Sequence, residues 1–493
     1  MKRYLWLWLQ SLILFLLLLG QVLAAEPLWF AGKSPRSAAR ELEAQLTTVV
    51  AAQIDPRFEA LRRALVEESE LQDIETRSRL YSDAYQLLAA FWQELYRRPA
   101  GKLDLNEPFL LVPDDSLLPR LTEAARDARL MEAVLQLEPL FDDYLLTRNW
   151  IRHYLSLPAP PTLKGPLRLI APGEWADEVV LIRQRLVDLN LMPPNDGGQW
   201  MDSALVARIQ DFQSQHGLAA DGVVGPSTRY WLYLSGRERA RLLARSLLRQ
   251  VHDHHFFARD HFRVNIPGFQ AVWVEGQQIR FRSKVVVGRL QRQTPTMHSA
   301  LKYVVINPRW NVPRSILRRD ILPKIASDGG FVARHGYEVV GAEGQVLALT
   351  EEQIQSAAQQ GFPYRLRQKP GPGNALGRYK FYLDNARAIY LHDTPESHLF
   401  RYRQRAFSSG CVRLDQAEEL AYQLLHRNRT SASQIARWQS RREPKWVEIT
   451  EPVPTYLVYW TAWIEGGQPQ FRRDIYGWER PTSEVTTVRQ SHR

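Results

Sequence analysis

Hydrophobic positions in the first third of the chain recur at the spacing of an α-helix. Three apolar stripes have this spacing: Leu42, Leu46, Val49 and Val50; Tyr81, Tyr85, Leu88, Trp92 and Leu95; and Leu130, Val134, Leu137 and Leu140. Ser34 followed by Pro35 is typical of a helix cap and a first helical position. We expect residues 25–157 to form a helical scaffold domain, with the aromatic stripe in its core and not on a ligand-binding face.

A proline-rich connector at residues 157–161 interrupts this pattern and predicts a linker over 158–176. Two short apolar faces follow it: Val179, Ile182, Leu186 and Leu189; and Leu205, Ile209, Phe212 and His216. Gly217 and Gly222 suit tight turns, and Pro226 suits the first turn of a third helix. The pattern predicts a compact three-helix module over 177–234.

From residue 262 onwards the apolar period shortens to that of β-strands. Strands are predicted near 262–264, 271–274, 284–287, 303–306 and 388–391, all rich in β-branched and aromatic residues. The strand pattern stops over 314–373, which predicts a mixed insertion beside the active site if the flanking strands pair. The predicted fold class is multidomain α+β: a helical scaffold, a three-helix module, a mainly-β catalytic domain at 250–465 and a tail at 466–493.

Composition narrows the function classes. With 45% hydrophobic and 24% charged residues the chain is globular and not disordered. A formal charge of +11 favours an anionic partner or matrix. The basic residues are scattered and no nucleic-acid motif accompanies them, so no nucleic-acid partner is expected.

The N-terminus predicts export. Lys2 and Arg3 precede an apolar run at 5–19, and small residues lead to a cleavage point after Ala24. Counted from Tyr4, the run is still shorter than the roughly 20 residues of a membrane-spanning helix. A cleaved signal peptide at 1–24 is therefore favoured over an uncleaved anchor, which would tether the protein to the inner membrane.

The chain has a single cysteine, Cys411, so an intramolecular disulfide is excluded. It is either an inert buried thiol or a nucleophile. The polar turn of Ser408, Ser409 and Gly410 before it favours a nucleophile, because free structural cysteines prefer apolar packing. Asp415 with Glu418 predicts a capping box, which would place the thiol one turn before a helix whose dipole stabilises the thiolate.

His392, at the end of an apolar run, is the candidate general base. The Gly410 and Cys411 amides could form an oxyanion hole. Asp393 follows His392 directly, and adjacent side chains on a strand point to opposite faces. A backbone carbonyl is therefore the expected partner of the second ring nitrogen.

Several further charged residues have two interpretations. Arg413 binds a substrate carboxylate or orders the turn. Alternating Arg401, Arg403 and Arg405 form either a solvated face or a funnel for anionic substrates. The histidines at 252, 254 and 255 lack the i, i+4 spacing of a helical metal site, so no metal is expected.

These motifs carry a resemblance to a known family. His392-Asp393-Thr394 followed by residues 408–413 resembles the signature of the L,D-transpeptidase catalytic domain. Residues 265–269, 285–288 with 294–295, 307–308 with 310–313, and 374–377 resemble the large periplasmic subgroup, which carries a scaffold, a peptidoglycan-binding module and a capping insertion. Residues 209–213, 217–218 and 221–228 resemble that binding module.

The resemblance implies a ping-pong acyl transfer in the periplasm of a Gram-negative bacterium. Cys411 would attack the L,D bond of a tetrapeptide stem, release D-alanine and pass the acyl group to a diaminopimelate amine, giving a 3→3 crosslink, with His392 moving the protons. It implies no cofactor, peptidoglycan stem peptides as partners, and penicillin-binding protein synthases as further candidate partners. The residues expected to contact substrate are Arg413, Ser408, Ser409, Asp393, Thr394, Trp310 and Asn311.

The sequence departs from the family pattern at two positions. Many members have glycine in place of Asp393 and a second histidine in place of Ser409. Ser409 would therefore act by hydrogen bonding and not as a base, and Ser408 is expected to order the turn. Alternatives to crosslinking are an L,D-carboxypeptidase, an enzyme that attaches envelope proteins to the wall, and a non-catalytic wall-binding scaffold.

Overall fold

The computed structural model describes residues 28–479, except 72, 140, 164–166 and 195–196. The expected signal peptide and Leu140 therefore lie outside the described residues. The chain divides into two compact units, one of residues 1–97 and 108–140 and the other of residues 98–107 and 141–493. Among the helices of the described part, none combines the length and apolar character needed to cross a bilayer.

The first unit is helical, as the apolar stripes predict. Its elements are β1 (Phe30–Ala31), β2 (Ser34–Pro35), α2 (Ser37–Ala52), α3 (Pro56–Leu71), α4 (Ile74–Arg97), α5 (Leu117–Arg126) and α6 (Leu130–Leu135). The aromatic stripe on α4 is buried, which confirms its place in the core. The cap expected at Ser34 is wrong, because Ser34 and Pro35 pair with β1 and α2 starts after Arg36.

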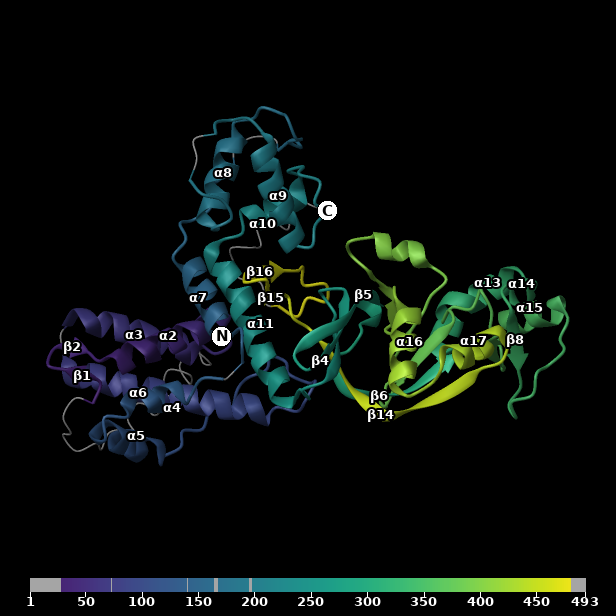
Figure 1. The fold of residues 1–493 in the computed structure, drawn as a ribbon, viewed down its shortest axis with the longest axis horizontal. Helices are drawn as coiled ribbons and strands as arrows, with labels where there is room; N and C mark the ends of the chain where they lie inside the picture. The colour runs from purple at the N-terminus through teal and green to yellow at the C-terminus, as the bar shows by residue number, and fades with distance from the viewer. Residues whose placement is uncertain (1–27, 72, 140, 164–166, 195–196, 480–493) are drawn as a thin grey trace. The chain divides into compact units, whose positions relative to one another are not determined.

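The second unit begins with helices. They are α7 (Tyr144–Leu155), α8 (Glu178–Asp188), α9 (Ser203–Gln215), α10 (Pro226–Leu232) and α11 (Gly236–Phe256). α8, α9 and α10 gather into the expected three-helix module (Figure 1), with Pro226 at the start of α10 as predicted. The Gln213 side chain binds the Gly222 amide and the Val223 carbonyl, both at 2.9 Å, and so fixes the turn before α10.

The catalytic domain is built on one sheet. Its strands are β3 (His261–Asn265), β4 (Gln270–Glu275), β5 (Gln278–Gly288), β6 (Met297–Ile306), β10 (Tyr379–Leu383), β11 (Tyr390–His392), β12 (Ala406–Ser408), β13 (Val412–Leu414) and β14 (Lys445–Val458). Their order in the described residues is β12-β5-β13-β11-β10-β6-β14-β3-β4. Because β4 also pairs with β5, the sheet closes on itself. Its inward side chains and those of α16 (Ala417–Arg427) and α17 (Ala432–Ser440) form the main core.

The insertion at 314–373 has a core of its own. The strand β7 (Trp310–Asn311) precedes the insertion. The insertion itself contains α12 (Arg314–Ile316), a π-helical turn (Leu317–Ile321), α13 (Leu322–Ser327), α14 (Phe331–Arg334), β8 (Tyr337–Val340), α15 (Glu351–Gln359) and β9 (Arg365–Gln368). β7, β9 and β8 form a small sheet, and α13, α14 and α15 gather beside β8 (Figure 1). This is the mixed structure that the sequence predicts.

The end of the described chain is folded. β15 (Ala462–Glu465), at the end of the expected catalytic domain, pairs with β16 (Gln468–Phe471), which lies within the region expected to be a tail. Farther on, the Glu479 carboxylate is buried and binds Arg245, at 2.5 Å, and Arg249 on α11. Burial opposes its charge, but the two guanidinium groups outweigh burial and lower the pKa of Glu479 to about 2.

Candidate active site

The register of three strands defines the face that carries the candidate nucleophile. β11 lies parallel to β13, with Leu391 beside Val412, and both side chains are fully buried in the core. Side chains alternate along a strand, so the residues on either side of this pair point to the opposite face. That face carries Tyr390 and His392 from β11, Arg413 from β13, and Cys411, which immediately precedes β13.

β10 adds a residue to this face that sequence reasoning missed. Lys380 pairs with His392 across β10 and β11, and its ammonium group lies 4.0 Å from the centre of the Tyr390 ring. Burial lowers the pKa of Lys380, while the negative charge of a Cys411 thiolate raises it. Alternation could have placed Tyr390 on the face of His392. Lys380 has no local signal, because its position depends on how β10 pairs with β11.

The turn before the thiol is held by side-chain hydroxyls. Ser408 donates to the Cys411 carbonyl at 2.6 Å and accepts the Gly410 amide at 3.1 Å, which confirms that Ser408 orders the turn. Gly410 has φ +116°, a conformation that L side chains rarely adopt. Because its amide is already bound to Ser408, the oxyanion role expected for Gly410 stays a prediction that requires Ser408 to release it.

The hydroxyl of Thr294 also supports this turn. Thr294 is fully buried, donates to the Gly410 carbonyl at 2.7 Å and accepts the Gly288 amide at 2.8 Å. A Cβ on Gly288 would lie 2.1 Å from the Arg292 carbonyl, so this close approach requires glycine. Tyr476 completes the support, because its hydroxyl donates to the Gly288 carbonyl at 2.7 Å.

The Cys411 thiol is half-buried, and its environment acts on its pKa in two directions. Burial is the largest influence and raises the pKa. Hydrogen bonding from Tyr390 and the charges of Lys380 and Arg413 lower it, but burial prevails. The resting thiol is therefore protonated at neutral pH and needs a base.

The helix that follows the thiol does not supply the expected dipole. Cys411 leads into the strand Val412–Leu414, and α16 starts only after its N-cap Gln416. A strand advances by roughly 3.3 Å per residue, whereas a helix dipole acts within the first turn. The predicted thiolate stabilisation by this helix is wrong. So is the capping box of Asp415 and Glu418, because Gln416 is the N-cap and has no side-chain cap.

His392 is buried and has a defined tautomer. Its Nδ1 lies 2.6 Å from the Asp393 carbonyl, which confirms the expected backbone partner. A carbonyl oxygen only accepts, so Nδ1 carries the proton and Nε2 has the free lone pair. Burial, and then Arg413, lower the pKa of His392 to about 3, so the ring is neutral at pH 7. Within the described structure His392 makes no hydrogen bond to the Cys411 thiol, which instead donates to the Ala388 carbonyl at 3.8 Å, although both side chains lie on one face.

Asp393 and Thr394 order the backbone near His392. The Asp393 carboxylate accepts the amides of Arg378 at 2.8 Å and Thr394 at 2.7 Å, and burial raises its pKa. The Thr394 hydroxyl accepts the Glu396 amide at 3.2 Å. These contacts are structural, and contact of either side chain with substrate stays a prediction.

The remaining candidates lie around the same face. Arg413 forms an ion pair with Glu396. Ser409 accepts a hydrogen bond from Arg292 at 2.9 Å, and Arg292 also binds Asp320 of the insertion, which links the catalytic turn to that insertion.

Trp310 and Asn311 form β7, which pairs with β9 of the insertion. Trp310 is buried, and hydrogen bonding from Trp310 lowers the pKa of Tyr390 against a larger rise caused by burial. Asn311 is exposed. Among the described residues no group of three His, Cys, Asp or Glu side chains is placed to hold a metal ion. His252 instead contacts the Arg98 carbonyl at 3.0 Å, and His254 stacks on Phe141.

Two segments of the chain match known families. Residues 259–438 match the L,D-transpeptidase catalytic domain, and residues 176–232 match the family described as "Putative peptidoglycan binding domain". A curated relative from Haemophilus influenzae, named "Putative L,D-transpeptidase", is 37% identical over 217 residues. That match spans 44% of this chain and 44% of the relative's own length.

Two solved structures are also similar. One, of the Ldtfm-avibactam carbamoyl enzyme, has 8% identity and a TM-score of 0.21 over 46% of this chain and 64% of that chain. The other, of the L,D-transpeptidase from Xylanimonas cellulosilytica, has 13% identity and a TM-score of 0.16 over 60% of this chain and 100% of that chain. At these TM-scores neither supports a conclusion about this protein. By its sequence matches, the chain contains an L,D-transpeptidase catalytic domain at residues 259–438 and a putative peptidoglycan-binding domain at residues 176–232.

Proposed function

We propose that the protein is a cysteine L,D-transpeptidase that forms 3→3 crosslinks in peptidoglycan. The observation that carries the proposal is the shared face of β11 and β13, which bears the single cysteine together with a neutral, buried histidine. The family matches supply the reaction class. The Cys411 thiol would be the nucleophile and His392 the general base and acid.

The reaction would start from a protonated thiol and a neutral imidazole. Nε2 of His392 accepts the thiol proton when the two groups close to hydrogen-bond distance, since catalytic contacts are often loose without substrate. The thiolate attacks the carbonyl carbon of the third stem residue, and Lys380 and Arg413 stabilise negative charge on this face. The C–N bond then breaks, and His392 returns the proton to the departing D-alanine amine.

The acceptor completes the transfer. A diaminopimelate side-chain amine attacks the thioester, His392 takes a proton from it, and Cys411 leaves as the free thiol. The substrate contacts proposed for Arg413, Ser408, Ser409, Asp393, Thr394, Trp310 and Asn311 belong to this scheme. The wall substrate and the binding module support action outside the cytoplasm, in the periplasm, with export by a signal peptide at 1–24. Penicillin-binding synthases, as suppliers of strands, are proposed partners.

The test is turnover of disaccharide-tetrapeptide by the purified mature protein and by Cys411→Ala, with products identified by mass spectrometry. A dimer that has lost one D-alanine, absent with the variant, is expected. Tripeptide alone would assign the protein as an L,D-carboxypeptidase. No turnover, with Cys411 also unlabelled by a carbapenem, would overturn the enzyme proposal and favour a wall-binding scaffold.

A further inference from the structure

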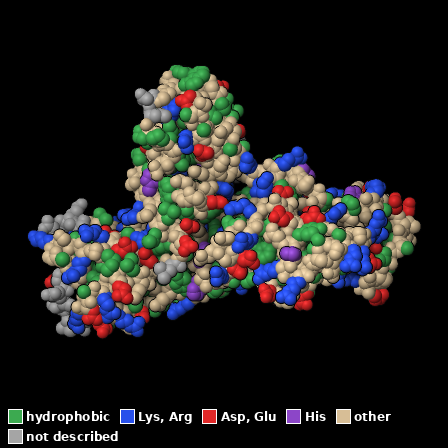
Figure 2. Space-filling model, in the orientation of Figure 1, with side chains coloured by type: hydrophobic (Ala, Val, Ile, Leu, Met, Phe, Trp, Pro, Cys, Tyr) green, Lys and Arg blue, Asp and Glu red, His purple; other side chains and the backbone are tan. Residues whose placement is uncertain are grey.

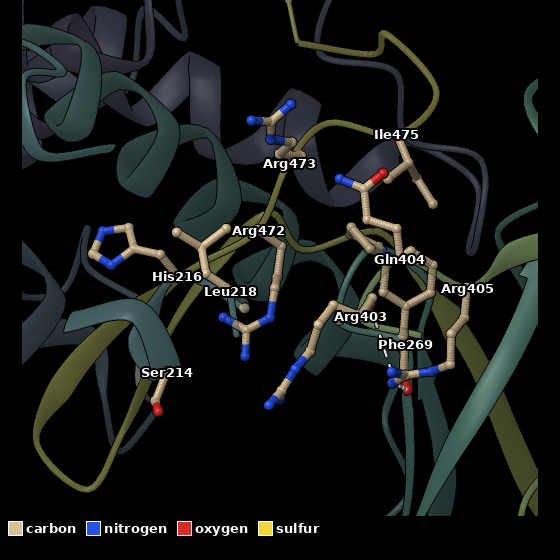
Figure 3. Close-up of a pocket in the computed structure, with 13 residues that line it drawn as sticks. Ser214, His216, Leu218, Phe269, Arg403, Gln404, Arg405, Arg472, Arg473 and Ile475 are labelled. Atoms are coloured by element: carbon tan, nitrogen blue, oxygen red, sulfur yellow. Dashed lines mark hydrogen bonds between the residues drawn. The ribbon is translucent and has the colours of Figure 1, made fainter. Parts of the chain in front are cut away.

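A cavity of about 130 Å³ lies between the three-helix module and the catalytic domain (Figure 3). Residues 214 and 216–218, at the end of α9, form the wall contributed by the module. Residues 267–269 and 403–405 form the wall contributed by the catalytic domain, and residues 472, 473 and 475 close the cavity. Residues 403–405 lead directly into β12 and the turn of Cys411, so the cavity is connected along the chain to the candidate nucleophile.

The charged side chains that line this cavity are all arginines. Its lining includes Arg403, Arg405, Arg472 and Arg473 and no acidic side chain. Within the described part of the chain, none of these four makes an ion pair with Asp or Glu. Elsewhere Lys and Arg side chains are spread over the visible surface and interleaved with acidic ones (Figure 2). A cluster of guanidinium groups without ion-pair partners therefore distinguishes the cavity from the visible surface.

Two of these arginines are held by the protein itself. Arg405 donates to the carbonyls of Val285, Tyr402 and Phe269, at 2.7 to 3.1 Å. Arg473 donates to Ser227 at 3.2 Å, and its guanidinium group points away from the others in Figure 3. Both contribute charge, but neither is free to follow a ligand.

The other two arginines, Arg403 and Arg472, have guanidinium donors available to a ligand. Among the described residues Arg403 makes no side-chain hydrogen bond, and it is exposed. Within the described structure Arg472 hydrogen-bonds through Nη1 alone, which donates to the carbonyls of Gln215 at 2.8 Å and Phe471 at 2.7 Å. Its guanidinium group lies over the Trp463 ring, 4.8 Å from the ring centre, and its side chain is close enough to Gly217 that a Cβ there would come within 2.9 Å of Nε. In Figure 3 the guanidinium groups of Arg403 and Arg472 point toward the same space.

The two groups also interact electrostatically. The pKa of Arg472 is lowered to about 10, chiefly by burial; the charges of Arg405 and Arg403 also lower it, and Glu465 raises it. An anion placed between Arg403 and Arg472 would relieve this repulsion. Guanidinium groups bind carboxylates through two parallel hydrogen bonds, which suits the planar forks on either side of this space.

We propose that the cavity binds a carboxylate of a peptidoglycan stem peptide between Arg403 and Arg472. The assignment of a stem peptide rests on the proposed function. The stem carries free carboxylates, and one wall of the cavity belongs to the peptidoglycan-binding domain. The volume suits a carboxylate-bearing side chain, because it is several times the space that one water molecule needs. Of the alternating arginines 401, 403 and 405, the last two line this site and Arg401 does not.

The first test measures binding in the Cys411→Ala background, where turnover cannot interfere. The probe is a disaccharide-tripeptide with free carboxylates, titrated by calorimetry against the full chain. Arg403→Gln is expected to weaken binding about tenfold, and added salt to weaken it further in the parent protein. Because Arg403 is exposed and unbonded, the variant should keep the parental melting temperature, which is measured alongside.

The matched control is Arg401→Gln, which removes an exposed arginine from the same segment but outside the cavity. It is expected to bind the probe as the parent does. An equal loss in both variants would indicate a general effect of charge and overturn the proposal. Unchanged binding by Arg403→Gln would also overturn it.

The chemistry of the ligand is tested with two further probes. The same disaccharide-tripeptide with its carboxylates converted to carboxamides should bind weakly to the Cys411→Ala parent and to its Arg403→Gln variant, with equal affinity for the two. Inorganic phosphate that displaces the acid probe at similar concentration would identify a general anion site and overturn the assignment to a stem carboxylate.

Labelling of Cys411 by a carbapenem in the wild-type chain separates this proposal from the proposed function. If Cys411 is labelled but Arg403→Gln binds the probe as the parent does, the cavity site is excluded and the transpeptidase proposal stands. Loss of binding in Arg403→Gln without labelling or turnover would retain the carboxylate site and remove the enzyme.

Discussion

At the scale of single residues, the state of the thiol depends on opposing influences from named neighbours. Burial raises the pKa of Cys411 and lowers that of His392 to about 3. Both shifts favour the neutral forms, so the resting pair is thiol and imidazole and not an ion pair. His392 would then contribute proton transfer without stabilising a resting thiolate.

His392→Ala tests this distinction. Because the ring is neutral at pH 7, its loss removes no charge from Cys411, and the pH profile of alkylation by iodoacetamide should stay unchanged. Acylation by a carbapenem, which needs proton transfer, should fall about 10²- to 10⁴-fold. An alkylation profile that moves to higher pH in the variant would instead indicate a resting ion pair.

Lys380 is expected to act on the thiol through its charge. Lys380→Met removes a cation that lowers the pKa of Cys411, so that pKa should rise. Alkylation at pH 8 would then slow about tenfold, because the thiolate is the reactive form. Lys284→Met, an exposed lysine on the neighbouring β5, is the control and should react as the wild type does. Equal rates in all three proteins would exclude this role.

At the scale of elements, the catalytic turn depends on the loop between β5 and β6. Thr294 is fully buried and joins Gly288 to Gly410 through its hydroxyl. Thr294→Val keeps the shape but leaves two buried backbone groups without this partner. We expect the free energy of unfolding to fall by about 1–3 kcal/mol, and carbapenem acylation to slow because the turn loosens.

The control for this variant is Thr296→Val, two residues along the chain. Its hydroxyl donates to the Gly101 carbonyl at 2.9 Å, away from the catalytic turn. It should lose stability without slowing acylation. If both variants acylate at the wild-type rate, Thr294 does not position the turn.

The same elements show what the sequence could predict. The strands at 262–264 and 303–306 and the partner of His392 follow from local rules, namely alternation and the backbone chemistry of adjacent residues. The predicted helix dipole at Cys411 was wrong. The composition of residues 412–414 also suits the start of a helix, but pairing of β13 with β11 and β5 holds them in an extended strand. Lys380 and Thr294 reach the site through pairing and loop packing, which a single sequence does not encode locally.

At the scale of the whole molecule, buried histidines are expected to set the pH dependence of stability. Burial lowers the pKa of His261 to about 4, and lowers that of His216 well below its ordinary value. Between about pH 6.5 and 4 the unfolded chain binds protons that the folded chain does not. Stability is therefore fully present above pH 6.5 and is lost as the pH falls toward 4. Glu479, whose pKa is lowered to about 2, adds a loss in the same direction below its ordinary value of 4.5.

His261→Phe isolates one contribution to this acid sensitivity. The His261 ring is buried and lies 4.7 Å from that of Phe257, so phenylalanine keeps the ring contact but cannot titrate. Denaturant titrations from pH 7.5 to 4.5 should show a stability slope that is shallower by up to about 1.4 kcal/mol per pH unit than in the wild type. His398→Phe replaces an exposed histidine and should keep the wild-type slope. A wild-type stability that stays flat down to pH 5 would contradict the argument, because it would mean that these rings are already charged or solvated in the folded protein.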